Sequence, residues 1–250
     1  MGILGKKVFF LYPPSVIREE LITRLLEEEY EIYMLKNPDD AKRLLRKFSD
    51  SIVFINIDEG LTEKEWETWI RDIQSDKQTG QVGIGILSYN NDDELRKKYL
   101  MDIGIQCGYI HMKLSLEEAT KILLKTLRAN EAKGRRKYLR VDCQDDHLSS
   151  INIRVDGNQI NGTIRDISIV GLSCTFEQEA GLPKNALLKD IQLKLRGTLI
   201  KADAIVFGNR SDGLSTIYVL LFTKTLSGPD RQKIRRYIQT TLQNSIKMNL

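Results

Sequence analysis

Residues 135–140 read Arg-Arg-Lys-Tyr-Leu-Arg, and residues 166–171 read Asp-Ile-Ser-Ile-Val-Gly. The first stretch contains the spacing R-x-x-x-R, from Arg136 to Arg140, and the second contains D-x-S-x-x-G. Either stretch alone is weak, because a basic run is usually a solvated surface or a linker, and Asp, Ser and Gly are ordinary turn residues. Their order, their separation and the strand pattern around them make the pair informative.

Beyond Gly134 apolar residues recur with a period of two, which predicts β-strands. Strands are expected near 151–155, 160–167, 172–176, 191–195, 199–207 and 217–222. Turn residues at 156–158 and 209–213 predict a hairpin and a second turn. Pro229 suits the first turn of a helix, on which a single apolar stripe is formed by Ile234, Ile238, Leu242 and Ile246. About six strands and one helix predict a small antiparallel barrel.

Together, the two motifs and the barrel pattern resemble the PilZ domains of bacteria, over about residues 134–247. That resemblance implies a receptor for the second messenger cyclic di-GMP, with Arg135, Arg136, Arg140, Asp166, Ser168 and Gly171 as ligand-binding residues. It also implies that the arginine segment wraps onto the barrel when the ligand binds. Because this segment directly follows the first half of the chain, binding is expected to rearrange the two halves.

The residue types fit the chemistry of such a ligand. An arginine can bond the O6 and N7 acceptors of guanine together, and its planar fork matches a phosphate. Asp166 and Ser168 can accept from guanine N1 and N2, and Gly171 suits a sharp turn or a close approach to the ligand. In PilZ domains an arginine at the position of Arg135 goes with two stacked dinucleotides, so two per barrel are expected.

In the first half, short apolar runs alternate with amphipathic segments. Strands are expected at 7–11, 31–35, 51–56, 82–87 and 108–112, and helices at about 15–30, 39–48, 63–76, 93–104 and 116–130. Five strand–helix units of this size predict a doubly wound parallel sheet.

This order resembles the receiver domain of bacterial response regulators, over roughly residues 5–128. The acids that hold magnesium in receivers are replaced by 12–14, Tyr-Pro-Pro, and Asn56 stands where the phosphoacceptor aspartate belongs, with Asp58 two residues on. Ser88 and Lys113 match the remaining active-site positions. Without paired carboxylates there is no magnesium cage, so a degenerate receiver that takes up no phosphate is predicted.

Composition excludes several other classes of function. Hydrophobic residues make up 41% of the 250 residues, enough for two cores, and the net charge of +4 does not require nucleic acid. The three cysteines are widely separated, which predicts neither zinc nor disulfides and fits a reducing cytoplasm. The two histidines, His111 and His147, have no motif-linked nucleophile or metal partner, so no catalytic and no metal-binding residue is assigned. No signal peptide or membrane span is expected.

The sequence therefore predicts an α/β receiver-like domain at 1–128, a linker at 129–134 and a β-barrel PilZ domain at 135–250. The predicted function is a cytoplasmic, non-enzymatic cyclic di-GMP receptor that needs no cofactor and acts on an unidentified downstream protein. A homodimer is possible, and nucleic-acid binding by the basic run is a weaker alternative that would show a steep salt dependence. The main alternative is a ligand-free interaction module in which both domains are degenerate.

Overall fold

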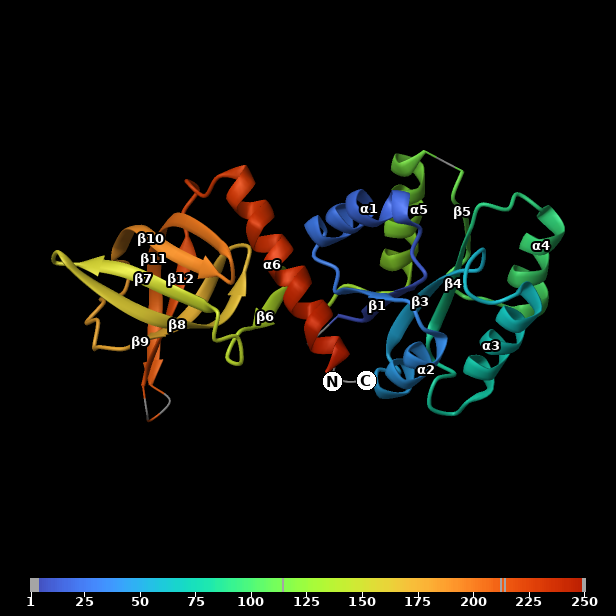
Figure 1. Ribbon diagram of the computed structural model, residues 1–250, viewed down its shortest axis with the longest axis horizontal. Coiled ribbons are helices and arrows are strands. Elements are labelled where there is room, and N and C mark those ends of the chain that lie inside the picture. The colour runs from blue at the N-terminus through green and yellow to red at the C-terminus, as the bar shows by residue number, and fades with distance from the viewer. Residues whose placement is uncertain (1–4, 114, 212, 214, 249–250) are drawn as a thin grey trace. The chain divides into compact units, whose positions relative to one another are not determined.

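The computed structural model of this chain describes residues 5–113, 115–211, 213 and 215–248, without the side chains of 15–19 and 116. It divides into two compact units, drawn in Figure 1. The first comprises the described residues up to Lys137 together with those from Leu242 onward, and the second is Tyr138–Thr241. None of the helices in these described ranges is long and apolar enough to cross a membrane.

The first unit is a five-stranded parallel sheet, as predicted, and its strand order is β2-β1-β3-β4-β5. Its strands are β1 (Lys7–Leu11), β2 (Ile32–Leu35), β3 (Ser51–Asn56), β4 (Gly83–Ser88) and β5 (Tyr109–His111). The strand β3 is buried along its whole length, which explains its continuous apolar sequence, because helices cover both faces of such a sheet. This is the doubly wound order with a switch point between β1 and β3.

Helices connect these strands. They are α1 (Ser15–Glu27), α2 (Pro38–Lys47), α3 (Glu63–Ser75), α4 (Asp93–Lys97), which continues as a π-helical segment η1 (Lys98–Ile103), and α5 (Leu116–Ala129). In Figure 1, α1 and α5 lie together on one face of the sheet, and α2 to α4 lie on the other. Asn37 caps α2, and capping boxes built on Thr62 and Ser115 begin α3 and α5.

The second unit contains a closed antiparallel barrel of six strands in the order β8-β7-β10-β11-β12-β9, with β9 returning to β8. A seventh strand, β6 (Arg140–Asp142), pairs with β8 beyond the end of β7. The six barrel strands are β7 (Ser149–Val155), β8 (Asn158–Ser168), β9 (Gly171–Phe176), β10 (Leu187–Leu195), β11 (Thr198–Ser211) and β12 (Thr216–Phe222). Alternate residues of β7, such as Ile151 and Ile153, fill its interior.

The helix α6 (Gly228–Lys247) follows the barrel, and Ile234, Ile238, Leu242 and Ile246 are all buried on its predicted stripe. Within the second unit a polar network also anchors it. The Tyr237 hydroxyl donates to the Asp146 carboxylate over 2.8 Å, and the same Asp146 oxygen accepts from Ser149 and Arg196.

The structure departs from the predicted elements at several places, including β10, which begins at Leu187 rather than at residue 191. The helix α1 ends at Glu27 rather than near residue 30, and the helix expected at 93–104 changes to π-helical geometry at Lys98. The turn expected at 209–213 is partly wrong, because β11 continues through Ser211; residues 212 and 214 lie outside the described part. The sequence pattern also gave no sign of β6, which is only three residues long.

Candidate functional site

The short strand β6 joins the two sequence motifs. Its register pairs Arg140 with Ser168 and Asp142 with Asp166, so the last arginine of R-x-x-x-R lies beside the start of D-x-S-x-x-G. The Arg140 guanidinium is 3.3 Å from the Asp166 carboxylate, and the Arg140 side chain is 48% exposed. About half of the Arg140 side chain is therefore exposed to solvent.

Ser173 is a second neighbour that holds the Asp166 carboxylate. A β-bulge at Arg165 interrupts the pairing of β8 with β9, and Asp166 then lies opposite Ser173, whose hydroxyl donates to the Asp166 oxygen Oδ2. The other oxygen, Oδ1, is buried and accepts no hydrogen bond from any described residue; its contact with Arg140 is electrostatic only. Buried oxygens normally accept a hydrogen bond, so this atom has acceptor capacity that no described residue uses.

The D-x-S-x-x-G sequence ends in a tight turn between β8 and β9. The Ser168 hydroxyl donates to the Gly171 carbonyl over 3.0 Å and is almost fully buried, so it fixes this turn. A Cβ atom on Gly171 would lie 2.2 Å from the Leu220 carbonyl oxygen of β12. Glycine is therefore required at this position by the close approach of a neighbouring backbone.

Four of the six predicted ligand-binding residues are thus brought together in the second unit: Arg140, Asp166, Ser168 and Gly171. The remaining two, Arg135 and Arg136, belong to the first unit, where both are exposed and form no ion pair with a described residue. Ser173 was missed by the sequence reasoning. The only signal for it was strand parity, because Leu172 and Cys174 alternate around it.

Burial dominates the chemistry of the cysteine beneath this site. It raises the pKa of the Cys174 thiol well above its usual range, and the nearby Asp166 raises it further. The thiol therefore stays protonated, as suits a core residue.

The carboxyl end of the first sheet carries Asn56, Asp58 and Ser88, the positions that the sequence analysis matched to a receiver active site. Asn56 is fully buried, and its side-chain amide donates to the Tyr12 carbonyl over 3.0 Å. Asp58 accepts hydrogen bonds from the Ser88 hydroxyl, over 2.7 Å, and from the Tyr89 backbone N–H. These donors bind the Asp58 carboxylate, and no group of three potential metal ligands occurs among the described residues.

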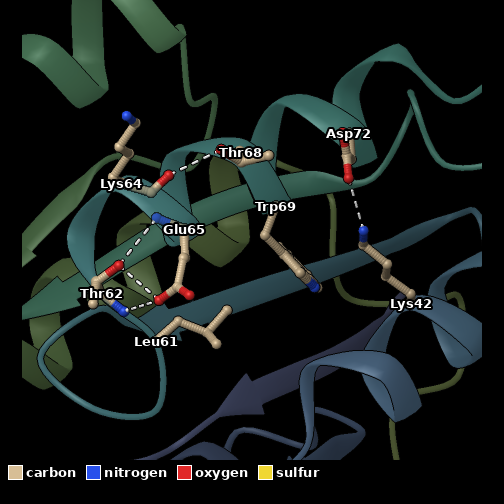
Figure 2. Close-up of a pocket in the computed structure, with 8 residues that line it drawn as sticks. All are labelled: Lys42, Leu61, Thr62, Lys64, Glu65, Thr68, Trp69 and Asp72. Atoms are coloured by element: carbon tan, nitrogen blue, oxygen red, sulfur yellow. Dashed lines mark hydrogen bonds and ion pairs between the residues drawn. The ribbon is translucent and has the colours of Figure 1, made fainter.

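The first unit also has a groove between α2 and α3, and Figure 2 shows that Lys42, Trp69 and Asp72 line it. Lys42 pairs with Asp72 over 2.9 Å, and the Trp69 indole N–H donates to the Pro38 carbonyl. The Thr62–Glu65 capping box closes one end. Because these polar groups bond one another, the groove is a packing seam between two helices and carries no functional assignment.

The second half of the chain matches a known domain family. Residues 134–240 match the PilZ domain family. The chain therefore contains a PilZ domain, in agreement with the resemblance of its motifs. No curated protein matches the chain.

Solved structures similar to parts of the chain include the PilZ domain with c-di-GMP of YcgR from Escherichia coli. It is 16% identical with a TM-score of 0.39, and the match covers 46% of this chain and 96% of that chain. The K. pneumonia MrkH–c-di-GMP complex is 21% identical with a TM-score of 0.42, over 46% of this chain and only 55% of that chain. The chemotaxis response regulator CheY4 of Vibrio cholerae is 17% identical with a TM-score of 0.41, over 50% and 98%.

Proposed function

We propose that this chain is a receptor for cyclic di-GMP and that the dinucleotide binds at the surface formed by Arg140 and Asp166. The observation that supports this most strongly is the pairing of β6 with β8, which brings the two motifs into contact. A surface with an exposed guanidinium and a buried acceptor lacking a donor suits guanine, which offers paired acceptors on one edge and donors on another.

Each residue has a distinct role in this proposal. Arg140 and Arg136 bond the guanine edge or the phosphates, and the Asp166 oxygen Oδ1, which accepts no hydrogen bond from a described residue, accepts from guanine N1 or N2. Ser168 and Gly171 hold the turn that presents Asp166. Arg135 carries a second dinucleotide, whose two phosphates need another cation. No catalytic residue or cofactor enters the proposal.

Calorimetry on the full chain tests the binding. We expect cyclic di-GMP to bind, and Arg140→Ala or Arg136→Ala to weaken binding by about 1–3 kcal/mol, which is roughly 5- to 150-fold. Arg154→Ala is the matched control, because Arg154 is an exposed arginine of β7 that lies outside both motifs. Cyclic di-AMP should bind much more weakly, since adenine cannot offer guanine's N1 and N2 donors. No binding, or equal losses in all three variants, would favour the ligand-free interaction module.

The proposal extends to a change in arrangement, because the arginine segment connects the two units directly. Cysteines introduced at exposed Lys77 and Gln159 allow energy transfer between dyes, one on each unit. The three native cysteines are buried, and burial raises the pKa of Cys107 and Cys143 to about 11, so labelling should be selective. A transfer efficiency that does not change on saturation with cyclic di-GMP would contradict the rearrangement.

A further inference from the structure

The first unit contains a cavity of about 510 Å³ at the edge of its sheet opposite to Asp58 and Ser88. Lys6 precedes β1, Asp50 precedes β3, Tyr30 lies between α1 and β2, and Arg128 lies in the last turn of α5. The segment after α5 completes the lining with Glu131, Lys133, Gly134 and Arg135. Neither the ligand motifs of the barrel nor the receiver-like edge accounts for this cavity.

The backbone conformation after α5 positions the segment that completes the cavity lining. Glu131 adopts a left-handed conformation (φ 51°) just after α5, which ends the helix and turns the chain back. The Lys6 N–H then donates to the Ala132 carbonyl over 2.9 Å. The two segments approach so closely that a Cβ atom on Gly5 would lie 2.7 Å from that carbonyl oxygen. Arg135 is thereby brought into the lining of a cavity formed by residues of the first unit.

Positive charge exceeds negative charge in this cavity, because four cationic side chains and two carboxylates line it. The cations are weakly engaged. Lys6 lies 3.4 Å from Asp50, and Arg128 lies 3.4 Å from Glu28. Within the described part of the chain, the Lys133 ammonium lies 5.9 Å from the Tyr30 ring centroid, and neither Lys133 nor Arg135 forms an ion pair. In the groove of Figure 2, by contrast, Lys42 has a carboxylate at 2.9 Å.

The carbonyl groups at the end of α5 already have hydrogen-bond partners in the backbone. Its last carbonyls, those of Thr126, Leu127 and Arg128, accept hydrogen bonds from the backbone N–H groups of Asn130, Ala132 and Glu131. The cationic side chains are therefore not needed to neutralise the negative end of the helix, and Arg128 contacts the Tyr30 hydroxyl and Glu28 instead.

We propose that this cavity binds a small molecule bearing a pyrophosphate group, with Arg128, Lys133 and Arg135 as its cationic contacts. Its volume lies within the range of small-ligand pockets and exceeds what a single phosphate fills. Guanidinium groups match phosphate oxygens in pairs, and a lysine adds a point charge. Asp50 and Glu131 can accept hydrogen bonds from the neutral part of such a molecule, which favours a nucleotide over bare pyrophosphate.

A ligand in this cavity should affect the binding of cyclic di-GMP, an inference that rests on the proposed function. The same Arg135 side chain cannot contact a phosphate in the cavity and one on a second dinucleotide. An occupied cavity should therefore lower the number of dinucleotides bound per chain from two toward one.

The test uses pyrophosphate as the probe, with the full chain and calorimetry, and no dinucleotide present. We expect saturable binding of one pyrophosphate per chain, weakened at least fivefold by Lys133→Ala and by Arg128→Ala. Lys64→Ala is the control, because Lys64 is an exposed lysine of α3 at the opposite edge of the sheet. Guanosine diphosphate and adenosine diphosphate should bind more tightly than pyrophosphate. Circular dichroism confirms that each variant is folded.

Two results would overturn the proposal: no pyrophosphate binding at millimolar concentration, or equal affinity in the Lys133→Ala and Lys64→Ala variants. Binding of duplex DNA that Lys133→Ala abolishes, without pyrophosphate binding, would assign the cations to nucleic acid instead. Since Lys133 lies outside both motifs, Lys133→Ala should leave the affinity for cyclic di-GMP unchanged. The failure of the pyrophosphate proposal can therefore be distinguished from the failure of the cyclic di-GMP proposal.

Discussion

Replacing Asp146 by alanine should destabilise the second unit, because this carboxylate anchors α6 to the barrel. One of its oxygens accepts from the Arg196 guanidinium over 2.9 Å, the Ser149 hydroxyl over 3.0 Å and the Tyr237 hydroxyl over 2.8 Å. The Asp146 side chain is only 10% exposed. Its removal breaks these three hydrogen bonds and a fourth, from the Leu148 backbone N–H to the other oxygen, and leaves the Arg196 charge without its anion.

The loss of unfolding free energy depends on which interactions remain in the variant. Hydrogen bonds to a charged group contribute about 1.5–3 kcal/mol, and breaking a buried ion pair costs about 3–5 kcal/mol. Two features lower the expected loss: Arg196 is 31% exposed and can be solvated, and the Ser149 and Tyr237 hydroxyls, 2.8 Å apart, can still bond each other. We expect Asp146→Ala to lower the free energy of unfolding by about 2–4 kcal/mol, and Tyr237→Phe by about 1–2 kcal/mol.

Urea denaturation followed by two probes measures this effect and locates it. The only tryptophans, Trp66 and Trp69, are both in α3 of the first unit, so their fluorescence reports on that unit alone. Far-ultraviolet circular dichroism reports on both units. The variant should shift the dichroism transition attributed to the barrel and leave the tryptophan transition in place.

The matched control is Asp145→Ala, which removes the same charge from the adjacent exposed position. Burial by itself would raise the pKa of Asp146, but the hydrogen bonds from Arg196, Tyr237 and Ser149 outweigh it and leave the pKa lowered. A lowered pKa adds stability above the unfolded value, near pH 4, which is lost as the pH falls through the folded value. The difference between wild type and Asp146→Ala should therefore shrink below about pH 4. Equal stability of the two alanine variants at pH 7 would refute the reasoning.

Three further predictions concern the candidate sites. Gly171→Ala should lower the stability of the barrel by about 1–3 kcal/mol and weaken dinucleotide binding, because its Cβ would overlap the Leu220 carbonyl; unchanged urea midpoints would contradict this. Acetyl phosphate with magnesium should add no mass to the chain, since Asn56 stands at the acceptor position and the Asp58 carboxylate is engaged by Ser88; an adduct on Asp58 would show that the edge still works as a receiver. Calorimetry should give two cyclic di-GMP per chain, and fewer for Arg135→Leu; a wild-type stoichiometry near one would remove the second ligand.

The elements of both units could be read from the sequence because their signals are local. The buried strand β3 is a continuous apolar run, and α6 carries its stripe at helical spacing. The turn residues around Gly157 sit where the hairpin between β7 and β8 was expected. Each of these patterns depends on neighbours within a few residues, so the chain displays it without knowledge of the fold.

Tertiary structure alone decided which distant residues meet. The strand β6 is too short to show a period, and it forms because β8 offers a free edge beyond the end of β7. Asp146 finds Arg196 and Tyr237, 50 and 91 residues further along the chain, only when the barrel closes and α6 packs on it. Sequence determined the repeating elements and the residue types available for binding. Closure of the barrel and the turn of the chain after α5 determined which cationic side chain lies beside which carboxylate. Such pairings depend on long-range packing, which no local sequence pattern shows.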